Sequence, residues 1–258
     1  MHAAFIDTAT PAGADVRRFG AATALVTPSI PVIALNRVMG IGVERPLSPA
    51  LLGEIRDFYR MAGCPRWFVE WSTVARTENG ADLLAEHGGQ RGGGAVKLAG
   101  EVSGMTVSAP ASTLTVVEIG TESAGVFAAI VGPGLSVPAA GVPGILAPIG
   151  HEGWHYYLAL DGERPIAGAA LFHSGAAAWL GLCATVPEAR GRGAQTALLA
   201  RRIDDARRAG CDVITAETHP ETEARGNPSL RNMRRAGFTV EYLRPWYRFE
   251  SGAAVGSP

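Results

Sequence analysis

The chain has 258 residues, of which 47% are hydrophobic and 18% are charged, and its formal net charge is -1. This length and composition predict a globular protein with a sizeable buried core, as one large domain or two ordinary ones. The near-neutral charge and the lack of a long basic run argue against nucleic acid as a partner. No apolar stretch reaches the roughly 20 residues of a membrane-spanning helix, and the N-terminus lacks the basic-then-apolar order of a signal peptide. We therefore expect a cytoplasmic protein with no membrane partner.

The three cysteines, Cys64, Cys183 and Cys211, are an odd number, and none belongs to a C-x-x-C motif. Their spacing suggests neither a disulfide framework nor a zinc site. We expect three buried thiols and no bound metal.

Two stretches of the chain are similar to each other. Residues 51–64, LLGEIRDFYRMAGC, align without a gap with residues 198–211, LLARRIDDARRAGC, and share two leucines, an aspartate, an arginine and the closing Ala-Gly-Cys. Each has the apolar spacing of an amphipathic helix that stops at a glycine. A strand-like run follows each, at 66–73 and 211–218, and then a further helix and strand. The pattern indicates two related halves; chance similarity between two amphipathic helices is the alternative.

The second half has its own order of elements. Residues 101–113 are rich in small and turn-forming residues and are the expected linker. The Gly- and Pro-rich segment within 121–150 cannot be one regular helix and is expected to form short helical pieces and loops. Runs at 155–160, 166–174 and 178–186, joined by tight turns, predict an antiparallel meander of three strands.

The most informative loop is PEARGRGAQTALL at 187–199, between the meander and the second of the similar helices. A strand, a glycine-rich turn and a helix start bring free backbone N–H groups together at the positive end of the helix dipole, which suits a pyrophosphate. Glycines also let the backbone approach a ligand closely. The loop is not a Walker A motif, because no lysine follows it, and Thr196 stands where G-x-G-x-x-G needs its third glycine.

In this setting the loop resembles the motif of the GNAT acyltransferase superfamily, (Gln/Arg)-x-x-Gly-x-(Gly/Ala) at a helix start. Arg190 through Gly193 match its first four positions, whereas Gln195 departs from the small residue at the last. The order of elements over residues 115–250, including an asparagine-bearing loop and a helix that ends in AGF, agrees as well. The resemblance implies an α/β (α+β) GNAT fold, a mixed central β-sheet flanked by helices, in two GNAT-like halves. The implied domains are a degenerate GNAT-like domain at 1–108, a catalytic GNAT domain at 113–250 and a flexible tail at 251–258.

The resemblance also implies acetyl-CoA as the acyl donor. The strand before the loop would pair with the pantetheine arm, and backbone amides of the loop would hold the pyrophosphate, assisted by its arginines and by the hydroxyl of Thr196. Asn227 would lie near the acetyl group, or serve only as a turn residue before Pro228. The implied cofactor-binding residues are Cys183, Ala184, Thr185, Arg190, Gly191, Arg192, Gly193, Ala194, Gln195, Thr196 and Asn227.

Catalysis in the GNAT family is direct attack of an amine on the thioester, helped by a base and an acid. Glu217 aligns with a glutamate that serves as the base, a role suited to a carboxylate partly withdrawn from water; a plain surface carboxylate is the alternative. Met233 stands where the acid is commonly a tyrosine. Tyr242, Tyr247 or a water would have to replace that tyrosine, unless the thiolate needs no acid. His173 and His219 are further candidates for proton transfer, or structural histidines.

The first half lacks the cofactor loop. At the aligned positions 43–49 it reads VERPLSP, and Pro46 and Pro49 have no N–H groups to donate. We therefore expect this half to bind no acetyl-CoA and to be kept for architecture. The aromatic residues Trp67, Phe68 and Trp71 are expected in its core, with a lining role at the acceptor site as the alternative.

Three hypotheses follow. The first is an N-acetyltransferase that moves an acetyl group from acetyl-CoA to a primary amine, of a small molecule or a peptide, in a ternary complex. The second is a non-catalytic acyl-CoA-binding sensor or partner protein. The third is a nucleotide-binding module. The sequence does not specify the acceptor, the length of the acyl group, the general acid or the choice between monomer and homodimer.

Overall fold

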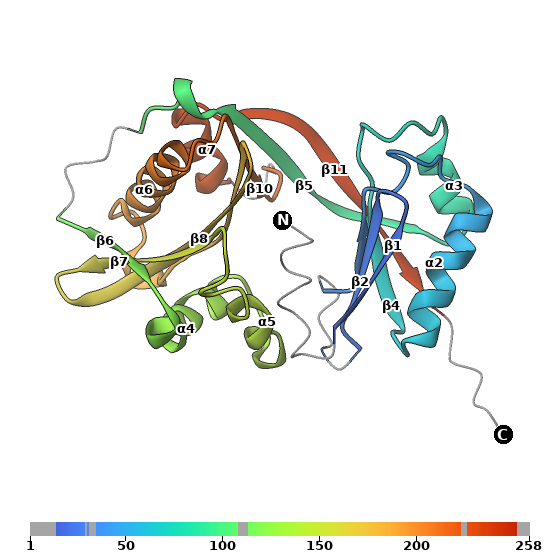
Figure 1. Ribbon diagram of the computed structural model, residues 1–258, viewed down its shortest axis with the longest axis horizontal. Coiled ribbons are helices and arrows are strands. Elements are labelled where there is room, and N and C mark those ends of the chain that lie inside the picture. The colour runs from blue at the N-terminus through green and yellow to red at the C-terminus, as the bar shows by residue number, and fades with distance from the viewer. Residues whose placement is uncertain (1–13, 29, 31–34, 108–112, 223–225, 252–258) are drawn as a thin grey trace. The chain divides into compact units, whose positions relative to one another are not determined.

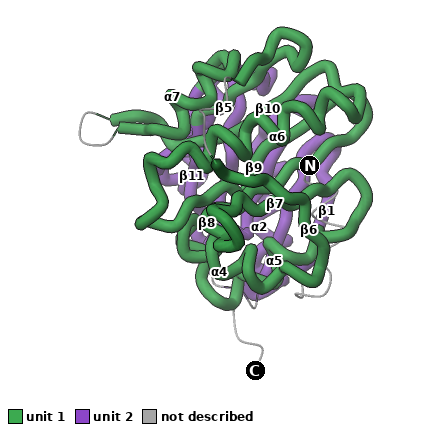
Figure 2. The backbone as a smooth tube through the Cα atoms, turned by 90° about the vertical axis from the view of Figure 1, so that its left-hand side faces the viewer, with its two compact units in different colours: residues 1, 96–242 green, residues 2–95, 243–258 purple. Residues whose placement is uncertain are grey.

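The computed structural model describes residues 14–28, 30, 35–107, 113–222 and 226–251. The chain forms two compact units, coloured separately in Figure 2. Unit 1 comprises residues 96–242, and unit 2 comprises residues 2–95 and 243–258. Each unit has its own hydrophobic core.

Unit 2 is a sheet covered by two helices. Its strand order is β1-β2-β3-β4-β11, with β3 and β4 parallel and the other described pairs antiparallel. One helix contributes Leu51, Ile55 and Tyr59 to the core of this unit, and the other contributes Leu84. The elements are β1 (Asp15–Phe19), β2 (Ala22–Val26), β3 (Arg37–Met39), α2 (Pro49–Met61), β4 (Arg66–Glu70), α3 (Gly80–Glu86) and the end of β11 (Thr239–Glu250).

An aromatic stack forms the centre of unit 2. The ring of Trp67 lies between those of Tyr59 and Phe249, at centroid distances of 4.6 Å and 4.5 Å. Trp67 and Phe68 are buried, and Trp71 packs against the same core. The prediction that these aromatic residues belong to the core is confirmed.

Unit 1 is a sheet in the order β5-β10-β9-β8-β7-β6, with β9 and β10 parallel and the other pairs antiparallel. The predicted meander is confirmed as β7 to β9, and the segment before it forms short helical pieces, as expected. The elements are β5 (Gln90–Glu101), η3 (Val102–Gly104), β6 (Thr115–Ile119), η4 (Thr121–Ser123), α4 (Ala124–Gly134), η5 (Ala139–Gly141), α5 (Val142–Leu146), β7 (Trp154–Asp161), β8 (Arg164–Ser174), β9 (Ala177–Thr185), η6 (Pro187–Ala189), α6 (Ala194–Arg208), β10 (Val213–Thr218) and α7 (Pro228–Arg235).

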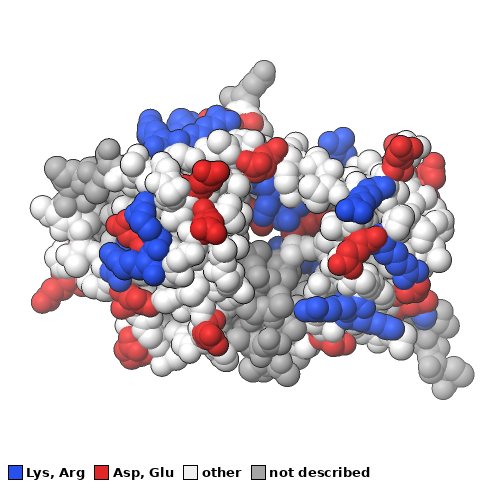
Figure 3. Space-filling view, turned by 45° about the horizontal axis from the view of Figure 1, so that its top comes forward, with Lys and Arg blue, Asp and Glu red and all other residues white. Residues whose placement is uncertain are grey.

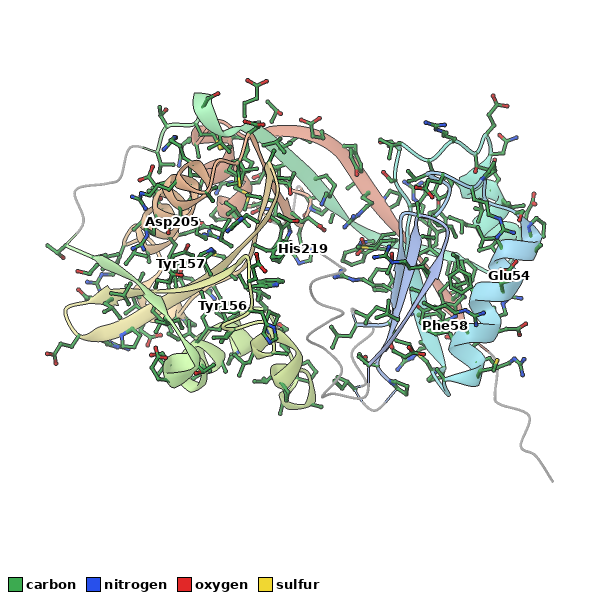
Figure 4. All side chains as sticks on the ribbon, viewed as in Figure 1. Glu54, Phe58, Tyr156, Tyr157, Asp205 and His219 are labelled. Carbon is green, nitrogen blue, oxygen red and sulfur yellow. The ribbon has the colours of Figure 1, made fainter. Side chains whose placement is uncertain are left out.

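Helices cover both faces of the unit 1 sheet (Figure 1). Tyr156 and Tyr157 are neighbours on β7 and therefore point to opposite faces. The Tyr157 hydroxyl donates to Asp205 of α6 at 2.8 Å, and the Tyr156 hydroxyl donates to the carbonyl of Ile145 of α5 at 2.8 Å (Figure 4). The predicted α/β class, with a mixed sheet flanked by helices, is confirmed.

The last strand of each sequence half pairs within the sheet built mainly by the other half. β5 follows α3 in the first half, yet its residues from Val96 onward pair with β10 in unit 1. β11 follows α7 in the second half, yet its residues from Trp246 onward pair with β4 in unit 2. The domain boundaries at 108 and 113 remain a prediction from the sequence. The two compact units do not coincide with these halves, because β5 and β11 each have residues in both units.

The segment predicted as a linker is partly built into unit 1. Val102 and Met105 are buried in its core, because η3 turns their side chains toward α6. Residues 108–112 lie outside the described residues. Of the predicted tail, only Ser251 is described, and its N–H donates to the carbonyl of Pro65 at 2.9 Å; residues 252–258 lie outside the described residues.

Charge and membrane features follow the composition. Figure 3 shows small groups of both signs over the face in view, as a net charge of -1 leads one to expect. In the described part of the chain, no helix is long and apolar enough to span a membrane.

Candidate active site

A pocket of about 990 Å³ lies in unit 1 where β9 meets the start of α6. The predicted loop and the predicted end of β9 both line it, together with residues from the ends of α4 and α7. The lining residues are Thr113, Leu114, Gly134, Cys183, Ala184, Thr185, Ala189, Arg190, Gly191, Arg192, Gly193, Ala194, Gln195, Thr196, Pro228 and Asn232. Every predicted cofactor-binding residue except Asn227 is therefore brought to one place.

The start of α6 offers backbone donors to this pocket. Gly191 and Gly193 have φ values of +79° and +86°, a region that L side chains rarely adopt, so glycine is required for this turn. Gly193 is the N-cap and no side chain caps the helix. The first bond within the helix joins the N–H of Ala197 to the carbonyl of Gly193, at 2.9 Å. The N–H groups of the three residues before Ala197 have no acceptor within the helix, which makes this end suitable for an anion.

Gln195 occupies the position where the family motif has a small residue, and both polar atoms of its side-chain amide form hydrogen bonds within the protein. Its Nε2 donates to Ser229 Oγ at 2.8 Å, and its Oε1 accepts from Asn232 Nδ2 at 2.7 Å. The side chain thus joins α6 to the first turns of α7. The larger residue is accommodated because it points toward α7, while its backbone N–H remains part of the helix start.

The two loop arginines are exposed. Arg192 pairs with Asp161 at 2.8 Å, at the end of β7. Exposed ion pairs of this kind contribute little to the free energy of folding. Breaking the pair with Asp161, so that Arg192 can bind an anionic ligand instead, therefore requires little free energy.

A bulge shapes the part of β9 that lines the pocket. The pairing of β8 with β9 shifts between Gly168 and Ala170, and Leu182 has a φ of +49°. Beneath the bulge, the buried guanidinium of Arg202 donates to the carbonyls of Ala170 at 3.1 Å and Gly181 at 3.4 Å. Arg202 therefore holds the bulge in shape, because a buried guanidinium must satisfy its donors. The sequence gives no sign of this role, since Arg202 reads as one more arginine of an amphipathic helix.

The strand edge beyond the bulge faces β10. β9 and β10 pair only as far as Leu180 and Ala216, and no further pairing between them is described although both strands continue. The backbone of Cys183 to Thr185 thus lies along a sheet edge that opens into the pocket. Such an edge can pair with an extended, amide-bearing ligand.

Cys183 is half-buried, whereas Cys64 and Cys211 are buried, so the expectation of three buried thiols holds for two of them. Burial raises the pKa of the Cys183 thiol, and the neighbouring Arg202 opposes this only in part. The neutral thiol is a poor nucleophile at physiological pH. The structure therefore gives no support for Cys183 as a nucleophile, and this residue lines the pocket.

Glu217 lies on β10 directly opposite Lys97 of β5. Lys97 Nζ donates to Glu217 Oε1 at 2.7 Å, and their side chains are 16% and 22% exposed. Glu217 is not one of the pocket-lining residues but is the first residue of β10 beyond its pairing with β9. Lys97 was missed in the sequence because it is distant along the chain and belongs to no motif.

Asn227 is the N-cap of α7. Its Oδ1 accepts from the N–H of Leu230 at 3.0 Å, and its Nδ2 donates to Thr218 Oγ1 at 3.0 Å and to the carbonyl of His219. These bonds fix the start of α7 to the end of β10. Its contact with a cofactor stays a prediction.

The candidate acids occupy different places. The usual tyrosine position holds Met233, which has no proton to donate and is buried in the unit 1 core. Tyr242 is half-buried on β11, and Tyr247 is buried in the unit 2 core. His173 stacks on His155, with ring centroids 5.3 Å apart, and burial together with His155 lowers its pKa. His219 is exposed just beyond the end of β10 (Figure 4).

The corresponding helix of the first half begins differently. α2 starts at Pro49, and the Ser48 side chain caps it by accepting from the N–H of Leu51 at 3.2 Å. Because Pro49 has no N–H and the N–H of Leu51 is capped, this helix end offers fewer free donors than the start of α6. Within the described ranges, no group of three or more potential ligands is arranged to hold a metal ion.

Comparison with known proteins agrees with this division. Residues 143–238 match the model of the Acetyltransferase (GNAT) family. No curated protein sequence matches the chain.

Solved structures resemble the whole chain. A GCN5-related N-acetyltransferase from Kribbella flavida is 16% identical with a TM-score of 0.66, over 98% of this chain and 95% of that one. A functionally unknown conserved protein from Staphylococcus epidermidis is 8% identical with a TM-score of 0.67, over 93% and 95%. A tandem GNAT protein from the clavulanic acid biosynthesis pathway is 14% identical with a TM-score of 0.59, over 92% and 79%.

At these identities the structures show a shared fold, which includes the first half of the chain. The loop, the bulged strand and the matched residues all lie in the second half. Residues 143–238 thus match the Acetyltransferase (GNAT) family, and the chain as a whole shares the fold of GNAT structures, including a tandem one.

Proposed function

We propose that the protein is an N-acetyltransferase that transfers the acetyl group of acetyl-CoA to a primary amine by direct attack in a ternary complex. The observation that carries the proposal is the uncapped start of α6, which opens into the same pocket as the free edge of β9. The match of residues 143–238 to the Acetyltransferase (GNAT) family supports an acyltransferase and acetyl-CoA as its donor. The cytoplasm as location, and an assembly of one or two chains, are parts of the same proposal.

The residues around the pocket suit the two polar portions of acetyl-CoA. Backbone amides of 191–196 would receive the pyrophosphate, with charge from Arg190 and Arg192. The backbone of Cys183, Ala184 and Thr185 would pair with the amides of the pantetheine arm. The bound cofactor supplies an activated thioester, and the protein's part is to hold it beside the amine.

The reaction removes two protons from the acceptor ammonium and adds one proton to the sulfur. Glu217 would take the first proton from the acceptor ammonium, directly or through a water, so that the free amine can attack the thioester carbonyl. A C–N bond forms, the nitrogen gives up its second proton to solvent, the C–S bond breaks, and the thiolate leaves and takes up a proton from solvent. No dedicated acid is proposed, because Met233 is buried at the usual tyrosine position.

An acyl-CoA-binding sensor is the second candidate. Two observations favour it: the buried Met233 and the ion pair that already engages Glu217. A sensor would bind acetyl-CoA by the same loop and release no thiol.

Two measurements separate the candidates. Acetyl-CoA should raise the midpoint of thermal unfolding more than ATP does, whereas a nucleotide-binding module would give the reverse order. Thiol release should then be followed with aminoglycoside-like, amino-acid and peptide amines. Transfer to any of them supports the enzyme, and binding without release supports the sensor.

The role of Glu217 has its own test. Glu217→Gln keeps the shape of the side chain and removes its basicity, so kcat should fall roughly 100-fold while acetyl-CoA affinity is retained. An unchanged rate across the pH range would remove Glu217 as the base.

A further inference from the structure

The basic residues of the chain are almost all of one type. Of its 23 lysine and arginine residues, 22 are arginines, and Lys97 is the single lysine. The two side chains differ chemically: arginine is a planar fork suited to paired contacts, and lysine is a compact charge on a flexible stem. A position that holds the single lysine therefore merits a specific explanation.

Lys97 lies beside the proposed base. β5 and β10 are antiparallel, and Lys97 and Glu217 are directly opposite each other, so both side chains are on one face of the sheet. The residues on either side, Leu98 and Ala216, point to the other face and belong to the core under α6. The Lys97 ammonium contacts Glu217 Oε1 at 2.7 Å, and both groups are largely withdrawn from water.

The pair also stands where the sheet opens. Ala216 is the last residue of β10 paired with β9, and Glu217 follows it. The β9 residues beyond this point include Cys183, Ala184 and Thr185, which line the pocket. A carboxylate at this place is useful for chemistry only if its direction is fixed, because small displacements of a catalytic group reduce rates steeply.

We propose that Lys97 is a positioning residue, which holds the Glu217 carboxylate in its working orientation for the acetyl transfer, and that the first half of the chain thereby completes the active site of the second. The inference rests on the proposed function. Lys97 acts through Glu217 and takes no proton itself. It reaches the site because β5, the last strand of the first half, pairs with β10.

The primary test is Lys97→Met, which keeps the length of the stem and removes the charge. With the fastest amine of the panel, kcat of the folded protein should fall roughly tenfold, while acetyl-CoA affinity stays at the wild-type value; the thermal midpoint should fall, because Glu217 loses its ion-pair partner. Lys97→Arg keeps the charge and should restore most of kcat. Arg60→Met, which removes an exposed ion pair with Asp57 in unit 2, is the matched control and should leave kcat unchanged.

The charge-exchanged double variant, Lys97→Glu with Glu217→Lys, separates positioning from simple stabilisation. It rebuilds the ion pair, so the thermal midpoint should be retained, but it should have the low kcat of Glu217→Gln because no carboxylate remains at 217. A Lys97→Met protein with wild-type kcat overturns the inference, as does one that loses midpoint and cofactor affinity in parallel. Wild-type protein that transfers acetyl to no amine overturns the proposed function, and the inference with it.

Discussion

The two similar helices begin in opposite ways. α2 has a proline at its first position and a serine cap that accepts a backbone N–H, whereas α6 has a left-handed glycine at its N-cap and no side-chain cap. Both helices end in Ala-Gly-Cys, with the glycine at positive φ. The same scaffold thus carries a closed helix start in one unit and an open one in the other. A helix N-terminus becomes a ligand site only when the protein leaves its donors unsatisfied.

Replacing the N-cap glycine of α6 should reduce acetyl-CoA affinity more than any other change described here. Gly193→Val places a β-branched residue at φ +86°, where it is strained, and turns the neighbouring amides away from the pocket. We expect the acetyl-CoA dissociation constant to rise at least roughly 1,000-fold, which is about 4 kcal/mol. Isothermal titration calorimetry measures it. Gly210→Val is the control, because Gly210 has a φ of +75° and open space around it but does not line the pocket; equal loss in both variants would contradict our interpretation of the loop.

A change in unit 2 should act on stability instead. Glu70 is buried between Arg37, at 3.0 Å, and Arg244, at 2.6 Å. Glu70→Gln leaves two guanidinium groups without their counter-charge, so the free energy of unfolding should fall by roughly 3 kcal/mol. Denaturant unfolding measures this loss, and acetyl-CoA affinity of the folded protein should not change. Glu54→Gln, in the exposed pair with Arg45, should cost less than about 1 kcal/mol.

Two substitutions at Thr196 test whether a single backbone N–H of α6 contacts the cofactor. Thr196→Pro deletes a backbone N–H in the first turn of α6, where the N–H makes no hydrogen bond within the helix. Thr196→Val deletes only the hydroxyl. Acetyl-CoA should bind the proline variant about tenfold more weakly than the valine variant, or about 1.4 kcal/mol. Equal affinities would show that this N–H does not contact the cofactor.

The smallest expected effect concerns the closed start. Ser48→Ala removes the cap of α2 and should lower the free energy of unfolding by about 1 kcal/mol. Calorimetric unfolding detects the loss. The same variant should bind acetyl-CoA as the wild type does, because its new free donors are next to Pro49, in a unit without the cofactor loop. A changed affinity for acetyl-CoA would contradict our proposal that only the start of α6 binds the cofactor.

The sequence predicts the local elements well. The apolar spacing and the glycine stops locate α2 and α6, and the glycines of 187–199 locate the open helix start, because each of these signals depends on neighbouring residues. Gln195 could be identified as unusual, but its partners on α7 could not. Asn232 enters the pocket only through the packing of α7 on α6.

The pairing of strands that are distant along the chain could not be predicted from the sequence. Residues 94–100 are predicted to form a strand, but the sequence of one strand does not identify the strand that pairs with it. Lys97 and Glu217 are 120 residues apart, and only the register of β5 on β10 brings them together. Likewise the linker prediction was wrong for Val102 and Met105, because their burial depends on a core formed mostly by later residues.

The crossing of β5 and β11 makes the chain hard to divide. A cut between residues 107 and 113 would leave each fragment with one strand that belongs to the other fragment's sheet. Phe249, at the far end of the chain, would remain stacked on Trp67 only if the fragments stayed together. The protein is thus a natural candidate for fragment complementation, in which two inactive pieces restore one another by exchanging strands. The second half of the chain therefore depends on the first, because without β5 the strand β10 would lose its antiparallel partner.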